Sequence, residues 1–220
     1  MTLDILKALA FTVLSVLVMQ LCGTWWLIEG PVDMTWFYER SYFLTGFLQF
    51  VVFLLLLSAL KGKTFVDIRK AEGRYYVLGV ILGLSYIFLQ TPISMLYNTC
   101  FGTDHELSYN FNLARLNSFN ALAIITFAPI AEEFFFRKFI QGSLLGRTTY
   151  WIAIPLSALL FGAVHLDFLG AIIFNAPLDF YRAFIATCGG LIAAILYQRS
   201  QSVGPAIAMH ICWNFGAWVM

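Results

Sequence analysis

Seven long apolar runs, separated by short polar connections, are the feature of this sequence that most limits its fold. A helix needs about 20 predominantly apolar residues to cross the hydrocarbon core of a bilayer. Only 11% of the 220 residues are charged and 60% are hydrophobic, whereas soluble domains carry about 25% charged residues. The sequence therefore predicts an all-α fold, a polytopic transmembrane helix bundle with about seven spans. We place the spans at about residues 5–28, 41–60, 75–97, 118–145, 150–166, 183–199 and 203–220.

The connections are too short to hold a soluble domain, so we predict one membrane domain with the lipid bilayer as its main partner. Residues 1–117 supply three N-terminal spans, and residues 118–220 form the C-terminal core. The net charge of +1 provides no footprint for nucleic acid, and we expect no such partner. The four cysteines lie far apart without CxxC spacing, which indicates neither a zinc finger nor a disulfide framework.

The distribution of Lys and Arg predicts the orientation of the bundle. Residues 61–74 hold five basic and two acidic residues, whereas residues 29–40 hold three acidic and one basic. Connections rich in Lys and Arg stay in the cytoplasm. We therefore expect a multi-pass integral membrane protein with a cytoplasmic N-terminus. The acidic residues expected on the opposite side are Asp104, Glu106, Asp167 and Asp179.

Two adjacent carboxylates, Glu132 and Glu133, lie inside the fourth run, where a charge costs at least about 2.5–3.5 kcal/mol at the bilayer centre. Glu133 and Arg137 are four residues apart, so they share a helix face and can pair. Glu132 points about 100° away and is free to face a cavity. Pro129 removes a backbone donor and can kink the helix, which makes room for water. An ion pair that only holds helices together would explain Glu133 and Arg137 but not Glu132.

Two histidines and an asparagine lie at a depth that matches Glu132. Glu132 precedes the turn at 146–150 by about as many residues as His165 follows it, so the two reach a similar depth on neighbouring helices. His210 and Asn214 are four residues apart and share a face of the last run. Singly, such residues are more often interhelical hydrogen-bonding groups than catalytic ones. Together they predict one polar cavity inside the membrane.

This set of side chains is sufficient for hydrolysis. Glu132, helped by His165, can take a proton from water as a general base. His210 and Asn214 can donate hydrogen bonds to a developing oxyanion. We therefore predict cleavage of a peptide or membrane-protein tail near the cytoplasmic face. Two alternatives stay open, a proton-coupled transporter that uses the same residues as a relay and a non-catalytic membrane scaffold.

Three short patterns resemble those of the CPBP family, the CAAX proteases and bacteriocin-processing enzymes, also called the Abi family. The family pattern is EExxxR, FxxxH and HxxxN, each on its own membrane helix. The resemblance covers about residues 118–217 and makes residues 118–220 the catalytic core. The three patterns read Glu132-Glu133-Phe-Phe-Phe-Arg137, Phe161-Gly-Ala-Val-His165 and His210-Ile-Cys-Trp-Asn214.

The resemblance implies a hydrolase, an intramembrane endopeptidase of a prokaryotic cell membrane. It places His165 beside the catalytic Glu132 on the attacking water. We expect no cofactor, although a zinc ion held by Glu132, His165 and His210 is an alternative, because the family is often described as metalloproteases. The implied catalytic residues are Glu132, Glu133, His165, His210 and Asn214, supported by Arg137.

Overall fold

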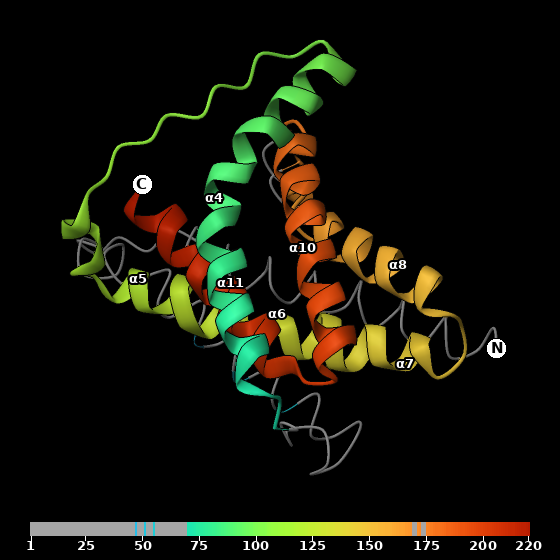
Figure 1. Ribbon diagram of the computed structural model, residues 1–220. Coiled ribbons are helices and arrows are strands. Elements are labelled where there is room, and N and C mark those ends of the chain that lie inside the picture. Colours follow the sequence, from blue (N-terminus) through green and yellow to red (C-terminus); the bar gives the residue numbers. More distant parts are fainter. Residues whose placement is uncertain (1–46, 48–50, 52–54, 56–69, 169–170, 173–174) are drawn as a thin grey trace.

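The computed structural model describes residues 47, 51, 55, 70–168, 171–172 and 175–220. These residues form helices and connections, with no strand among them. In the bundle, α4 packs against α11, and α10 packs against both α8 and α11 (Figure 1). In chain order the elements are α4 (Gly73–Phe101), η3 (Leu113–Leu116), α5 (Phe119–Leu122), η4 (Ala123–Phe127), α6 (Ala128–Glu133), η5 (Phe134–Gln141), α7 (Gly142–Leu145), α8 (Tyr150–Ala163), α10 (Phe180–Ser200) and α11 (Val203–Val219).

Helical segments coincide with five of the seven predicted runs. The described residues are therefore all-helical as predicted, while the count of about seven spans is not confirmed. Runs 5–28 and 41–60, and the orientation drawn from residues 29–40, lie almost wholly outside the described residues. The matched pairs are 75–97 with α4, 118–145 with α5 to α7, 150–166 with α8, 183–199 with α10 and 203–220 with α11.

Two of the described helices, α4 and α10, are long and apolar enough to cross a membrane. Helix α8 is equally apolar but has only 14 residues, fewer than the roughly 20 that a span needs. Large apolar side chains such as Val77, Ile81 and Phe88 are exposed along α4. Contact with lipid gives these side chains an apolar environment, which agrees with a membrane location.

The path from Phe119 to Leu145 is continuous but is not a regular α-helix. Segments η4 and η5 are π-helical, and α6, which carries both glutamates, lies between them. Pro129 has no N–H to donate, and the N–H of Ala128 bonds to the carbonyl of Ala123, five residues earlier. The disturbance that the sequence predicts at Pro129 thus takes the form of a wider helical turn. Such π-turns are rare and occur frequently at functional sites.

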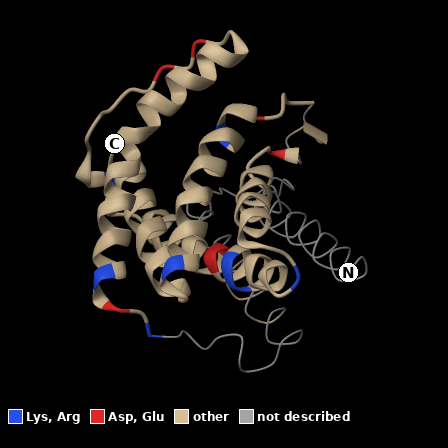
Figure 2. Ribbon diagram, turned by 45° about the vertical axis from the view of Figure 1, so that its right-hand side comes forward, with Lys and Arg blue, Asp and Glu red and all other residues tan. Residues whose placement is uncertain are grey.

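The bundle has a basic end and an acidic end (Figure 2). At the basic end, the start of α4 meets the start of α11, where Gly79 lies against the carbonyl of Pro205. At the acidic end, the last turns of α4 meet the start of α10, where the rings of Tyr97 and Tyr181 are 5.3 Å apart. The basic end carries Lys70, Arg74, Arg147 and Arg199, and the acidic end carries Asp104, Glu106, Asp167 and Asp179.

Close contact between α4 and α11 depends on glycine. A Cβ added at Gly83 would overlap the carbonyl oxygen of Met209, the residue before His210. The overlap is with backbone, so it cannot be relieved by turning a side chain. Gly83 therefore allows α4 to hold the part of α11 that carries His210.

We expect Gly83→Ala to lower the stability of the bundle by about 1–3 kcal/mol, the usual cost of overpacking a close contact. Gly73→Ala is the matched control, because a Cβ there meets nothing within 4 Å. Thermal unfolding of the two purified variants in detergent measures the difference. Equal melting temperatures would show that α4 and α11 move apart to accept the added Cβ without a loss of stability.

Candidate active site

The two adjacent glutamates on α6 have different partners. The carboxylate of Glu133 is 1% exposed and accepts a hydrogen bond from Nε of Arg137 at 2.8 Å. This confirms the pair predicted from their spacing of four residues. Glu132 is 8% exposed and makes no such pair with Arg137. The sequence therefore sorted the two carboxylates correctly.

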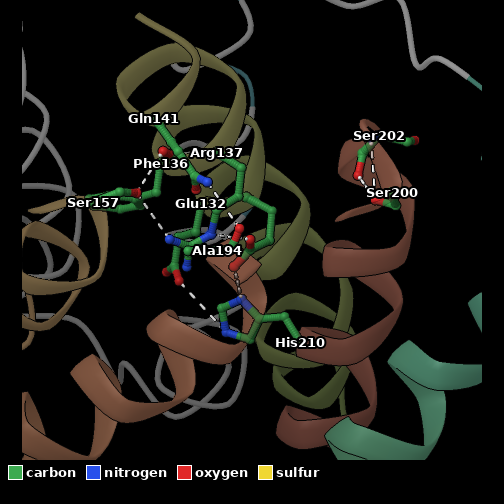
Figure 3. Close-up of polar contacts among 10 residues, drawn as sticks. Glu132, Phe136, Arg137, Gln141, Ser157, Ala194, Ser200, Ser202 and His210 are labelled. Atoms are coloured by element: carbon green, nitrogen blue, oxygen red, sulfur yellow. Dashed lines mark hydrogen bonds and ion pairs between the residues drawn. The ribbon is translucent and has the colours of Figure 1, made fainter. Parts of the chain in front are cut away.

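Arg137 connects the continuous helical path of residues 119–145, which we call the glutamate helix, to α8. It is fully buried, and its Nη1 donates to the hydroxyl of Ser157 at 3.1 Å (Figure 3). Ser157 in turn donates to the backbone carbonyl of Phe136 at 3.0 Å. The guanidinium also lies 5.3 Å from the ring centre of Phe161, in cation–π range. Ser157 is a part of the site that sequence reasoning missed.

His210 lies between the two carboxylates. Its Nδ1 is 3.0 Å from Oε1 of Glu133, and its Nε2 is 3.8 Å from Oε2 of Glu132 (Figure 3). Because the Glu133 carboxylate can only accept while it is ionised, Nδ1 of His210 carries a proton in this contact. Nε2 then has a hydrogen to donate only when the ring is doubly protonated. The contact with Glu133 is one that the sequence did not predict, and the expected role of His210 as an oxyanion donor stays a prediction.

His165 follows the end of α8, with its ring half-buried. Its Nδ1 is 2.8 Å from the backbone carbonyl of Phe161, the first residue of the same motif. A carbonyl accepts, so this contact places the proton of a neutral ring on Nδ1. Nε2 is then left as an acceptor, the form required for receiving a proton from water.

Asn214 is fixed against the glutamate helix by a carbonyl that the π-turn leaves free. The N–H of Ala128 bonds to Ala123, and Pro129 has no N–H, so neither can donate to the carbonyl of Ile124. The side-chain Nδ2 of Asn214 donates to this carbonyl at 2.8 Å. An amide nitrogen has two hydrogens, and one remains for another acceptor.

One cavity of about 640 Å³ brings the predicted residues together. Its wall contains residues from α6, α10 and α11 and from the turn after α8. Leu107 and Trp218 also line it, and both belong to the acidic half of the bundle. Glu133 and Arg137 do not line it and lie behind the wall. The predicted residues that line this cavity are Glu132, His165, His210 and Asn214.

The donors of the alternative zinc site do not fit a metal ion. Among the described residues, no group of three or more His, Cys, Asp or Glu side chains is arranged to hold one. We therefore derive no chemical step through a metal.

Comparison with known proteins agrees with this reading of the motifs. Residues 114–216 match the family described as "Type II CAAX prenyl endopeptidase Rce1-like". The chain is also 27% identical over 168 residues to a Bacillus subtilis (strain 168) protein named "Putative membrane peptidase YdiL". The match covers 74% of this chain and 64% of that protein. No solved structure matches the chain significantly. The matched region contains all three motifs, so both comparisons agree with the resemblance to the CPBP family of CAAX proteases and bacteriocin-processing enzymes.

Proposed function

We propose that this protein is an intramembrane endopeptidase that hydrolyses a peptide bond in a peptide or in the tail of a membrane protein. The observation that carries this proposal is the single cavity lined by Glu132, His165, His210 and Asn214. A carboxylate and two imidazoles that face one cavity can activate water and transfer its proton. The match to the Rce1-like family model and the peptidase relative support the same class of reaction.

Glu132 and His165 are the groups that we assign to the water. Glu132 takes the proton as general base, and Nε2 of His165 accepts a hydrogen bond from the same water. Nε2 of His210, 3.8 Å from Glu132, is the next acceptor for that proton. That distance is longer than a hydrogen bond, so the transfer requires a small approach of the two side chains.

Asn214 and His210 are the donors that we assign to the oxyanion. The second hydrogen of Asn214 Nδ2 is available, because Ile124 takes only one. His210 becomes a donor through Nε2 once it has received the proton from Glu132. The oxyanion donor thus appears at the step in which negative charge develops, which is where such a donor accelerates the reaction. When the intermediate collapses and the C–N bond breaks, the same proton passes from His210, through Glu132, to the leaving amine.

We further propose that substrate reaches the cavity from the acidic end. The cavity is lined by residues of the acidic half, such as Leu107, Asp179 and Trp218. The positive-inside rule places the basic end in the cytoplasm. On this proposal the cavity opens away from the cytoplasm, in contrast to the expectation that cleavage takes place near the cytoplasmic face.

Glu132→Gln and His165→Ala are expected to lower the hydrolysis rate by about 10²–10⁴-fold, the usual contribution of general acid–base catalysis. The substrate is first obtained by purifying Glu132→Gln and sequencing the bound peptides by mass spectrometry. Hydrolysis of those peptides by the wild-type protein and by each variant is then followed. Glu106→Gln is the control, since this acid lies outside the cavity. Wild-type rates in both Glu132→Gln and His165→Ala would refute the proposed function.

Hydrolysis of the same peptides is expected to continue in excess EDTA or 1,10-phenanthroline, because the donors do not form a metal site. The measurement is the rate before and after dialysis against each chelator. A loss of activity that zinc restores would instead establish the zinc-dependent alternative.

Cysteine labelling tests the side from which the cavity opens. In a cysteine-free background, Ala217→Cys in the cavity is expected to react with a membrane-impermeant maleimide in intact cells. Thr149→Cys, in the turn beside Arg147 at the basic end, is expected to react only after permeabilisation. The reversed pattern would place the cavity mouth in the cytoplasm.

A further inference from the structure

Arg182 is a cavity residue that lies outside all three motifs. It is in the first turn of α10, three residues after the helix-capping Asp179. It lines the same cavity as Glu132 and His165. Its permanent positive charge therefore affects the binding of any ligand beside Glu132 and His165.

The guanidinium of Arg182 makes no hydrogen bond or ion pair with any described residue. The nearest acid along the chain, Asp179, uses its carboxylate to accept the backbone N–H of Arg182 at 2.8 Å. The buried Arg137 contrasts with it, since Arg137 is bonded to both Glu133 and Ser157. Arg137 therefore stabilises the contact between helices, whereas the hydrogen-bond donors of Arg182 are available to a ligand in the cavity.

No other Lys or Arg occurs among the described residues that line the cavity. Apart from Arg182, the charged groups there are the carboxylates of Glu132 and Asp179, and the walls include Ile185, Trp213 and other apolar side chains. The two carboxylates repel an anionic ligand, so such a ligand has one favourable position, at Arg182. A guanidinium binds a carboxylate with two parallel hydrogen bonds, which fixes the orientation of the ligand as well as its position.

We infer that Arg182 binds a carboxylate of the substrate and so selects which peptide bond is presented to Glu132. The cavity volume of about 640 Å³ is within the range of sites that enclose drug-sized ligands, which suits a short peptide segment. The carboxylate is either the C-terminus of the substrate or an acidic side chain close to the scissile bond. This inference rests on the proposed function, because it assumes that the ligand of the cavity is a peptide substrate. The binding of a peptide can nevertheless be measured without its cleavage.

The experiment uses Glu132→Gln in detergent, a variant in which the proposed function predicts slow turnover, and isothermal titration with defined apolar peptides. Acetyl-Leu-Leu-Leu with a free carboxylate is compared with its C-terminal amide. Acetyl-Leu-Glu-Leu amide is compared with acetyl-Leu-Gln-Leu amide. The first pair detects recognition of a terminal carboxylate, and the second detects recognition of an acidic side chain. We expect the acidic member of one pair to bind about tenfold more tightly than its neutral partner.

Adding Arg182→Gln is expected to abolish this preference, and Arg182→Lys to keep part of it, because Lys retains the charge but not the paired donors. Arg115→Gln is the matched control, since Arg115 is exposed in the acidic half but does not line the cavity. A preference that survives in Arg182→Gln, or no preference in either pair, would overturn the inference. If Glu132 is not the catalytic base, peptides recovered after the titration and analysed by mass spectrometry are cleaved. A failure of the present inference instead leaves them intact and bound without a preference, so the two failures are distinguishable.

Discussion

The buried carboxylate of Glu133 is the group on which the arrangement of this site depends. It accepts hydrogen bonds from Arg137 and His210, and Arg137 extends the contact to Ser157 on α8. The glutamate helix, α8 and α11 are thereby joined through one charged group. Removing one member would leave an unpaired charge in the interior, which costs about 3–5 kcal/mol. The charge on Glu133 is compensated inside the protein, so Glu132 is the carboxylate left to face the cavity.

A second polar connection joins the same two helices one turn further along α11. Asn214 donates to the Ile124 carbonyl, which is free because Ala128 bonds elsewhere and Pro129 cannot donate. The glutamate helix thus contacts both His210 and Asn214, which lie one turn apart on α11. Two such contacts fix the rotation of α11 as well as its position. The π-turn therefore has a structural explanation: it supplies the acceptor that orients the predicted oxyanion donor.

The sequence predicted interactions between residues close together in the chain and did not predict those between distant residues. The apolar runs located five helices, and a spacing of four residues was enough to pair Glu133 with Arg137 and to turn Glu132 away. The contact of His210 with Glu133 joins residues 77 positions apart, and no periodicity encodes it. Ser157 looked like an ordinary small residue in an apolar run, and the Ile124 carbonyl that the π-turn frees has its donor, Asn214, 90 positions away. The spans before residue 70 lie almost wholly outside the described residues and stay predictions.

The packing on the two sides of Glu132 bears on whether the buried ionisable residues serve hydrolysis or transport. A proton-coupled transporter needs a path that continues past the relay to the other face of the membrane. Toward the basic end, the residues that follow Glu132 on its own helix are fully enclosed, and the ring of Phe136 packs edge-on against that of Phe161 at 5.1 Å. Within the described residues, the cavity is therefore closed on one side and lined with polar groups on the other. Such a pocket delivers water and substrate to a carboxylate and returns the product by the same opening, which suits a hydrolase. The enclosed side chains are Phe135, Phe136, Ile140 and Gln141, each 0% exposed.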